Sequence, residues 1–512
     1  MLYLVICFTL SICPNDAYLD IPDGITEILE HQYENCTNII QINFSNSIKA
    51  IRAYGFSGCS NISTLVFPLS LEIIDENAFS SCVNLTSIEF NNDNTELSIG
   101  CFESCSKLNH IDLPKFIETI PVKLFYKCEN LTKITIPETV KIIGAYSFCS
   151  CSNLIQVSFG DSCSKIEEWA FYGCDDLDIY IKSIPLEEIG EGAFYGNQKI
   201  SILKFPSTMI AIKNMAFSDC INLQSIEFNE GLKFLGNQSF QNCFAITNII
   251  LPSTLEYIGD SCFDSCKALD NNIDFHNNIK YIGDYAFSSC HNIDTITSYL
   301  ENDVYIGSHA FFPITCRQIK IYSNYLNFIN FFSDNHEIES IILDFHQSAT
   351  LPSLNNLDIL NNLTINCHNY SIAIPSNFVS SENVSISIYG NIQSISDDSF
   401  ANARISMFVY CGLTYVKGSF LKNAKQCQKI IVGPYYPGKT FGGLEISSVE
   451  NICELKPSKK LSGGAIAGII LATITFVVVT IVGFVYIYKI RKTQNKINHK
   501  IMLEKMVSED FG

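Results

Sequence analysis

Cysteine and histidine are the residue types in this sequence that could support catalysis or metal binding. The chain has 512 residues, including 22 cysteines and nine histidines. No CxxC pair occurs, and histidines such as His110, His276 and His291 lack the spacing of zinc ligands. The sequence also lacks a GxSxG elbow, an HExxH helix, a phosphate-binding loop and a Cys/His pair at a recognisable spacing. We therefore predict a protein that is not an enzyme and has no catalytic residues, metal site or cofactor.

The cysteines instead follow a repeat. Nine successive gaps of 23 residues separate the phenylalanines Phe56, Phe79, Phe102, Phe125, Phe148, Phe171, Phe194, Phe217, Phe240 and Phe263. Tyr33 extends this series backwards, and Phe287 and Phe311 extend it forwards with gaps of 24. Eleven cysteines stand three residues after these aromatics, namely Cys36, Cys59, Cys82, Cys105, Cys128, Cys151, Cys174, Cys220, Cys243, Cys266 and Cys290. Asn197 takes the cysteine position after Phe194.

The repeat cysteines are predicted to form a ladder of buried free thiols, because a small thiol packs well beside a core aromatic. Stacked coils place neighbouring rungs within the range of ~4.4 to 6.8 Å between Cα atoms that disulfides accept, so bridges between rungs remain an alternative. Cys411, Cys427 and Cys453 lie off the ladder and are the better disulfide candidates.

The consensus of the repeat, AFxxCxNLxxIxFPxxLxxIGxx, indicates which elements position these residues. The NLxxIxF segment ends in apolar-polar alternation, which predicts a short strand in a parallel sheet, and the following proline ends that strand. In the IGxxAFxxC segment, Ile258, Cys262, Phe263 and Cys266 have the spacing of one face of a helical turn, so we expect a short α-helix or 3-10 helix. Glycines precede that turn, where we expect positive φ: Gly144, Gly190, Gly236, Gly259, Gly283 and Gly307. Less regular strand patterns continue to about residue 433, giving about 18 coils.

This pattern resembles the BspA-like leucine-rich repeats, the 23-residue class found on surface proteins of oral bacteria, treponemes and mucosal protozoan parasites. The resemblance covers roughly residues 33–433 and is cleanest at 78–90 and 124–137. It implies an α/β leucine-rich-repeat solenoid, mainly parallel β with short helical or 3-10 turns, and a surface role in adhesion to host cells or matrix proteins. Protozoan members often end in one membrane span with a short tail. The later coils lose Cys and Pro, so they depart from the family pattern.

The segments outside the repeat predict a single-pass type I protein of the plasma membrane with its N-terminus outside. Residues 1–17 resemble a signal peptide, with a buried N-terminal cap strand as the alternative. Residues 18–433 form the solenoid ectodomain, 434–460 a cap or stalk, 461–488 one transmembrane helix and 489–512 a cytoplasmic tail. Gly464, Gly468 and Ala472 recur every four residues, the spacing that allows close helix contact and a homodimer, although small residues are also common in membrane helices.

The outward residues of the predicted strands are the candidate ligand-binding site. They are Thr86, Ser87, Glu89, Asn109, His110, Asp112, Thr132, Lys133 and Thr135, expected on a polar concave face. Any one of them could equally be a solvated residue without a partner. The net charge of −19 argues against nucleic acid as a partner, because phosphates need basic residues to neutralise them.

Nine N-x-S/T sequons are consistent with secretion, and five are candidate glycosylation sites: Asn43, Asn237, Asn362, Asn369 and Asn383. Asn61, Asn84 and Asn130 occupy the consensus asparagine of the repeat, which is expected to cap a turn and to be too buried for glycosylation.

We therefore predict a cell-surface protein that binds an external host or matrix protein, or a glycan, and that serves adhesion. The alternatives are a structural or antigenic coat protein without a specific ligand and a surface hydrolase.

Overall fold

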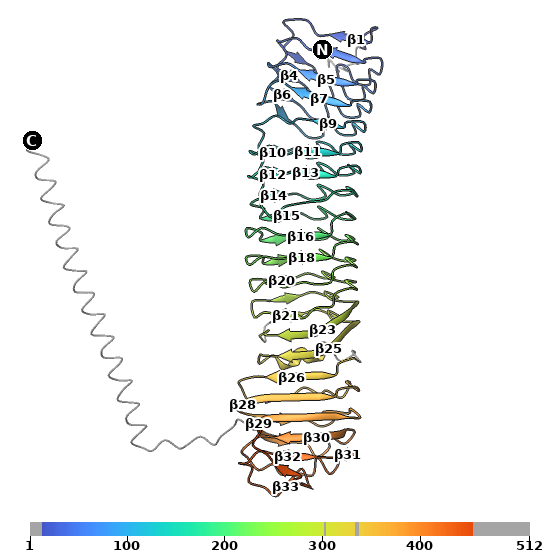
Figure 1. The fold of residues 1–512 in the computed structure, drawn as a ribbon. Coiled ribbons are helices and arrows are strands. Elements are labelled where there is room, and N and C mark those ends of the chain that lie inside the picture. The colour runs from blue at the N-terminus through green and yellow to red at the C-terminus, as the bar shows by residue number, and fades with distance from the viewer. Residues whose placement is uncertain (1–12, 302–303, 333–336, 454–512) are drawn as a thin grey trace, which may run out of the picture. The chain divides into compact units, whose positions relative to one another are not determined.

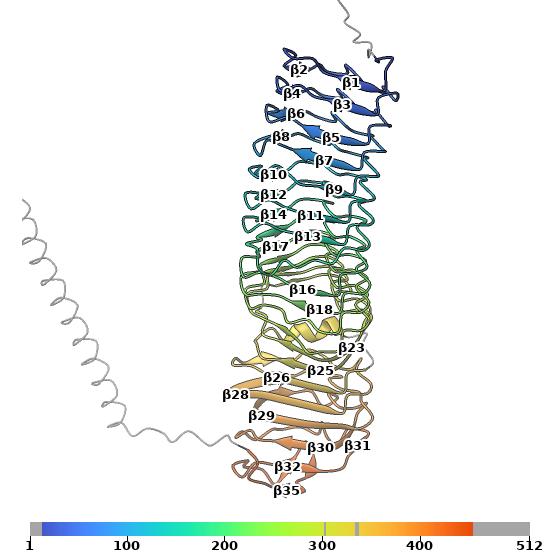
Figure 2. The same ribbon diagram turned by 45° about the horizontal axis from the view of Figure 1, so that its top comes forward.

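The computed structural model describes residues 13–301, 304–332 and 337–453. These residues form a parallel β-solenoid of about 18 turns, in which each coil lies directly on the next (Figure 1). Figure 2, turned about the horizontal axis, shows the same order of coils from β1 to β35. The predicted solenoid and its number of coils are confirmed.

The NLxxIxF segments form the strands that the sequence predicts, here called the first strand row. Each strand of this row pairs in parallel with a strand one repeat away, as Ile134 does with Val157. In the regular coils the row consists of β1 (Tyr18–Asp20), β3 (Gln41–Asn43), β5 (Thr64–Phe67), β7 (Ser87–Phe90), β9 (His110–Ile111), β11 (Lys133–Thr135), β13 (Gln156–Ser158), β16 (Ile202–Lys204) and β18 (Ser225–Glu227).

A second strand row, which the sequence analysis did not predict, lies at the LxxIG segments. It consists of β2 (Glu27–Ile28), β4 (Ala50–Ile51), β6 (Ile73–Ile74), β8 (Glu96–Leu97), β10 (Thr119–Ile120), β12 (Ile142–Ile143), β14 (Lys165–Ile166), β15 (Glu188–Ile189), β17 (Ala211–Ile212), β19 (Phe234–Leu235), β20 (Tyr257–Ile258), β22 (Tyr281–Ile282) and β24 (Tyr305–Ile306). The first four strands form one parallel sheet and the remaining nine form another. Most regular coils therefore contribute a strand to each of two faces.

The later coils contribute eleven strands to one sheet, and several of these strands are longer than those of the regular coils. The strands of this sheet are β21 (Ile273–Phe275), β23 (Cys290–Ser298), β25 (Ile314–Ile321), β26 (Ser340–Asp344), β27 (Ala349–Thr350), β28 (Asn362–Ile374), β29 (Val384–Ile395), β30 (Arg404–Tyr410), β31 (Gln426–Cys427), β32 (Ile430–Val432) and β35 (Ser448–Val449). An antiparallel hairpin, β33 (Thr440–Phe441) and β34 (Leu444–Glu445), precedes β35. Both the hairpin and β35 fall within the predicted cap.

The helical turns predicted at IGxxAFxxC are wrong. Turns take their place, and among the described residues the single helical element is the 3-10 helix η1 (Leu326–Phe332). Ser261 and Ser265 have φ of 51° and 65°, so left-handed residues flank Phe263 and stop a right-handed helix from extending. The amides of Phe263 and Ser265 donate to the next coil, to the carbonyl oxygens of Ala286 at 2.7 Å and Ser288 at 2.8 Å. The turns therefore hold neighbouring coils together, and we call this side the turn edge.

The glycines before this turn are needed because a side chain at these positions would collide with the preceding coil. The prediction of positive φ is wrong for all six, since none has φ in the left-handed range. A Cβ at Gly259 would lie 2.4 Å from the backbone nitrogen of Asn237 in the preceding coil. At Gly307 it would lie 2.3 Å from that of Asp284. Close stacking of the coils explains these glycines.

The core is a column of stacked phenylalanines beside the cysteine ladder. The ring centroids of Phe171 and Phe194 are 5.2 Å apart and nearly parallel, and both rings are fully buried. Each thiol also donates to a carbonyl oxygen one coil away, as Cys174 Sγ does to Phe148 O at 3.2 Å. Burial raises the pKa of the Cys105 thiol to about 12, so this thiol stays neutral.

Ten of the eleven repeat cysteines are free and buried, as predicted. Cys36 is the exception, because it forms a disulfide with Cys13, one repeat earlier. Cleavage after residue 17 would remove this disulfide. Cys411 and Cys453 form a second disulfide, which confirms two of the three off-ladder candidates, whereas Cys427 is free and half-buried.

The predicted transmembrane helix at 461–488, its packing residues Gly464, Gly468 and Ala472, the tail at 489–512 and most of the signal peptide lie outside the described residues. Within the described ranges, no helix is long and apolar enough to cross a membrane.

Candidate functional site

Five of the nine predicted binding residues lie together in one depression of the first strand row, which we call the strand-row hollow. It has a volume of about 870 Å³. Its lining residues include the predicted Ser87, Glu89, His110, Asp112 and Thr135, together with Leu65, Val66, Ile88, Phe90, Asp93, Leu113, Lys115, Phe116, Ile136, Pro137, Glu138 and Thr139.

The other four predicted residues, Thr86, Asn109, Thr132 and Lys133, are not in its lining. The Thr86 hydroxyl donates to the carbonyl oxygen of Ser63 at 2.9 Å, so it has a structural partner. Asn109, Thr132 and Lys133 are exposed beside the hollow.

The first strand row consists of several short sheets, and the hollow coincides with one of the breaks between them. β7 pairs with β9 through two residues, Ser87 with His110 and Ile88 with Ile111. β11 pairs with β13, and no ladder joins it to β9 in the described residues. The sheet therefore opens between His110 and Lys133, and side chains of both flanking coils line the opening.

The second strand row is interrupted at the same level, between β8 and β10. In neighbouring coils, the amide after the strand donates to the previous strand, as Ser98 N does to Ile74 O at 3.0 Å and Gly144 N to Ile120 O at 2.9 Å. Pro121 holds this position after β10 and has no N–H to donate to Leu97. A missing hydrogen-bond donor thus explains the break.

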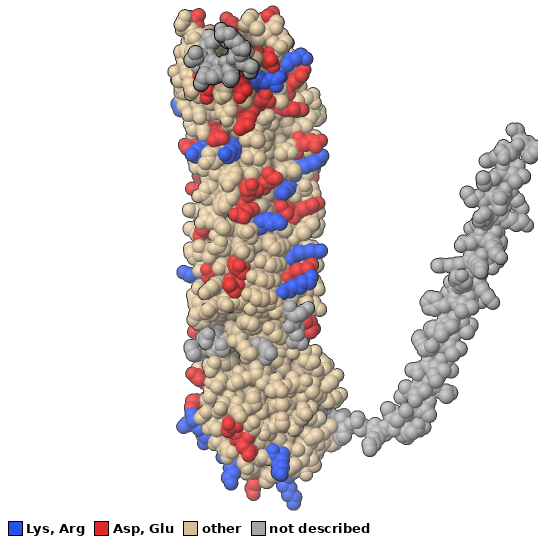
Figure 3. Space-filling view, turned by 180° about the vertical axis from the view of Figure 1, so that it is seen from behind, with Lys and Arg blue, Asp and Glu red and all other residues tan. Residues whose placement is uncertain are grey.

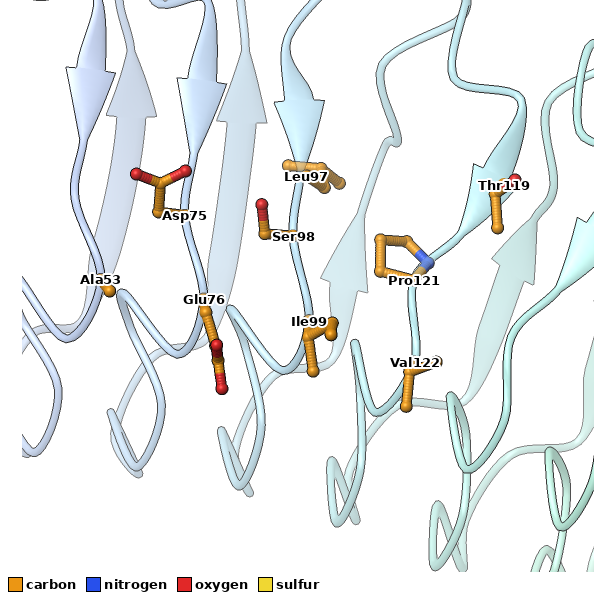
Figure 4. Close-up of a pocket in the computed structure, with 9 residues that line it drawn as sticks. All are labelled: Ala53, Asp75, Glu76, Leu97, Ser98, Ile99, Thr119, Pro121 and Val122. Atoms are coloured by element: carbon orange, nitrogen blue, oxygen red, sulfur yellow. The ribbon is translucent and has the colours of Figure 1, made fainter.

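A second hollow of about 610 Å³ lies at this break. Figure 4 shows Leu97, Ser98 and Ile99 along one side of it and Pro121 and Val122 along the other. In the described residues, this is the one level between β4 and β24 at which the second strand row is interrupted.

The strand-row hollow combines apolar and charged side chains. Val66 and Phe116 are 52% and 59% exposed, large values for apolar side chains. His110 Nε2 lies 3.5 Å from Asp112 Oδ2, and Lys115 Nζ lies 2.9 Å from Asp93 Oδ2. Such a surface can bury apolar groups of a ligand and hydrogen-bond to its polar groups.

Sequence reasoning missed Val66, Phe116 and Pro121, although Phe116 and Pro121 depart visibly from the repeat. Phe116 follows Pro114 by two residues, the position that Thr139 holds after Pro137 and Thr208 holds after Pro206. The hydroxyls of Thr139 and Thr208 donate to carbonyl oxygens of the preceding coil, Ile117 O at 2.6 Å and Leu186 O at 2.9 Å. The aromatic residue at a position where other repeats have threonine could have been recognised in the sequence as a candidate binding residue.

Charged side chains on the second strand row form ion pairs from coil to coil. Lys49 pairs with Glu72 at 2.9 Å, and Lys141 pairs with Glu118 at 2.9 Å. Figure 3 shows acidic and basic side chains side by side over the N-terminal and middle coils of the face in view. The charges of these two pairs are therefore balanced within the protein.

The consensus asparagines do have structural partners, but burial does not exclude all of them from glycosylation. Asn61 Nδ2 donates to Thr37 O at 2.7 Å and Asn84 Nδ2 to Ser60 O at 2.8 Å. Asn61 and Asn130 are nonetheless exposed, and Asn84 is half-buried.

Four of the five glycosylation candidates are exposed, namely Asn43, Asn362, Asn369 and Asn383. Asn237 is half-buried, and its Oδ1 accepts a hydrogen bond from the amide of Asp260 at 3.0 Å.

Three potential metal ligands that were not connected at the sequence level lie together in the later coils: Asp344, His346 and His368. Their spacing follows the coil, not a zinc motif, so a search for such motifs does not find them.

The repeats of this chain match a known family of leucine-rich-repeat proteins. The family model of the BspA type leucine rich repeat region matches residues 7–131, 118–243, 187–320 and 270–373. A surface protein of Trichomonas vaginalis described as bspA-like is 33% identical over 106 residues, which cover 21% of this chain and 17% of that protein.

Two solved structures are also similar to this chain. A leucine-rich repeat protein from Bacteroides ovatus is 26% identical with a TM-score of 0.44, covering 55% of this chain and 78% of that chain. The pneumococcal vaccine antigen PcpA is 19% identical with a TM-score of 0.38, covering 64% and 78% respectively.

Proposed function

Because this chain belongs to the BspA-type leucine-rich-repeat family, we propose that it is a cell-surface protein that binds an external protein or glycan through the strand-row hollow. The expected result of binding is adhesion to host cells or extracellular matrix. Residues 461–488 would anchor the solenoid in the plasma membrane with the N-terminus outside, and Gly464, Gly468 and Ala472 would allow a homodimer.

The observation that supports the binding site is the exposed pair Val66 and Phe116 beside Glu89, His110 and Asp112. Aromatic side chains in a partly apolar depression are typical anchors of interfaces and also stack on sugar rings. The similarity to a surface protein of Trichomonas vaginalis supports the location.

Phe116→Thr is the sharpest test of the site. The substitution removes the exposed ring and restores the hydroxyl that Thr139 and Thr208 use to bond the preceding coil, so the fold is expected to persist. We expect cells that display the full chain to attach to host cells or matrix-coated surfaces, and cells that display Phe116→Thr to attach at least tenfold less. Ile250→Thr is the matched control, because Ile250 is 72% exposed at the repeat position of Val66.

Charge reversal provides a second test. Glu89→Lys with Asp112→Lys is expected to weaken attachment, whereas Lys133→Glu, outside the lining, is expected to leave it unchanged. If display of the unaltered chain does not raise attachment to any surface, the binding function is wrong and a coat role without a specific ligand replaces it. Release of product from a glycan or peptide panel would support the hydrolase instead.

A further inference from the structure

The cluster of Asp344, His346 and His368 lies far along the chain from the strand-row hollow and is independent of it. Asp344 ends β26, and His346 follows two residues later. His368 lies in β28, one coil further along. One donor atom from each side chain lies within 4.8 Å of the others. His368 Nε2 is 2.8 Å from Asp344 Oδ1, and the two imidazole rings stack with centroids 4.1 Å apart.

The backbone brings these groups together in an unusual way. β26 and β28 run in parallel register, with Asp344 opposite Asn366. His368 has a φ of 50°, which is uncommon for a residue other than glycine, and lies where the register of β28 against β29 shifts between Asn366 and Ser371. Such irregularities redirect side chains, and here the result is that His368 faces the Asp344 carboxylate.

A further residue holds the carboxylate in place. Asn366 Nδ2 donates to Asp344 Oδ2 at 3.0 Å, while Asn366 Oδ1 accepts from the amide of His368 at 3.3 Å. Bonding of Oδ2 leaves Oδ1 to face the imidazole of His368. Outer hydrogen bonds of this kind orient the ligands of metal sites. The amide of His346 in turn donates to Asn324 Oδ1 at 3.3 Å, which ties the following segment to an earlier coil.

We propose that Asp344, His346 and His368 bind one divalent transition-metal ion, Zn²⁺ in preference to Ca²⁺ or Mg²⁺. Two imidazole nitrogens and one carboxylate oxygen are ligands that suit zinc, whereas the harder ions take oxygen ligands. His346 is exposed, so its ring can turn toward a shared ion, and Asp344 and His368 are half-buried. Three protein ligands leave a fourth tetrahedral position open to solvent or to a ligand from outside.

Calorimetric titration of Zn²⁺ into the chelator-treated full-length chain tests this site. We expect one ion per chain and binding at least tenfold weaker in His346→Ala and in His368→Ala. Asn366→Ala leaves the three ligands in place and is expected to weaken binding by about 10 to 100-fold. His291→Ala is the control, because His291 is exposed and lies outside the cluster, so it should not contribute.

The folded state of each variant is checked by circular dichroism, and His346, being exposed, is the substitution that should disturb the fold least. A Co²⁺ complex with a tetrahedral visible spectrum that His346→Ala abolishes would support the site independently. Absence of saturable Zn²⁺ binding overturns the proposal, and so does binding that remains equally tight in both histidine variants.

Discussion

Replacement of Asn197 by cysteine should stabilise the solenoid. Asn197 occupies the cysteine position of the repeat and is fully buried, and neither its Nδ2 nor its Oδ1 has a hydrogen-bond partner. In the adjacent coils, Cys174 and Cys220 occupy this position, and their thiols donate to the carbonyl oxygens of Phe148 and Phe194 at 3.2 and 3.3 Å. Asn197→Cys therefore removes two unpaired polar atoms and supplies a donor of the usual kind.

The size of the gain follows from the cost of burying polar groups. An unsatisfied buried donor or acceptor costs about 1 to 3 kcal/mol, so two of them at the low end give about 2 kcal/mol for Asn197→Cys. That free energy corresponds to a factor of about 30 in the equilibrium for local opening.

Hydrogen exchange measured by mass spectrometry is the appropriate assay. Each coil of a solenoid contacts only its neighbours, so the effect is local and a global melting curve would dilute it. We expect exchange to slow by about 30-fold in peptides that cover residues 190–223, with little change beyond residue 300.

The reciprocal substitution Cys174→Asn is the matched control and should accelerate exchange in its own coil, since it introduces the same unpaired amide. The reasoning is refuted if Asn197→Cys leaves exchange unchanged or faster while Cys174→Asn is tolerated.

Three further predictions concern the thiols, the glycines and the C-terminal disulfide. Iodoacetamide should label Cys427 before Cys105 in the native protein, because Cys105 is fully buried and Cys427 is half-buried. Burial raises the pKa of Cys105 to about 12 and that of Cys427 to about 11, so folding keeps both thiols neutral. The stability of the fold, measured by urea unfolding, should therefore fall as the pH rises above about 9, where the thiols of the unfolded chain ionise. Gly259→Ala should destabilise its coil by more than about 2 kcal/mol in urea, because the new Cβ would lie 2.4 Å from a backbone atom of the preceding coil. Removal of the disulfide by Cys411→Ser with Cys453→Ser should cost about 4 kcal/mol, as expected for a loop of 42 residues, with faster exchange in β32 and β35 as the readout.

The sequence was sufficient to predict the first strand row, the coil length and most of the cysteine ladder. Each of these depends on one side-chain pattern, such as the alternation around Ile134, which recurs at every 23rd residue. The second strand row was missed because its strands have only two residues, as in Ile142–Ile143, and two apolar residues carry no period. The helical turn was wrong because spacing does not report φ, and Ser261 and Ser265 adopt left-handed conformations.

The candidate site could be predicted only in part, because a site of this kind arises where the repeat is broken. Ser87, Glu89 and His110 were found from strand alternation, which places them on the outer face. The second hollow, at the break between β8 and β10, depends on Pro121, whose missing amide matters only when the neighbouring coil is known. The metal ligands come together because β26 pairs with β28 at an offset of 22 residues, as Asp344 does with Asn366. This offset differs from that of the regular repeat, so the repeat pattern does not reveal the cluster.

The paired interruption at β8, β9, β10 and β11 also has a mechanical consequence. At this level both strand rows lack a ladder, while the turn edge keeps its bonds, from Gly100 N to Val122 O at 3.0 Å and from Ser104 N to Tyr126 O at 2.7 Å. A rod joined along one edge and open along two others bends about that edge. A sideways force on the solenoid would therefore be taken up at this joint, and flexing there would widen or narrow both hollows together.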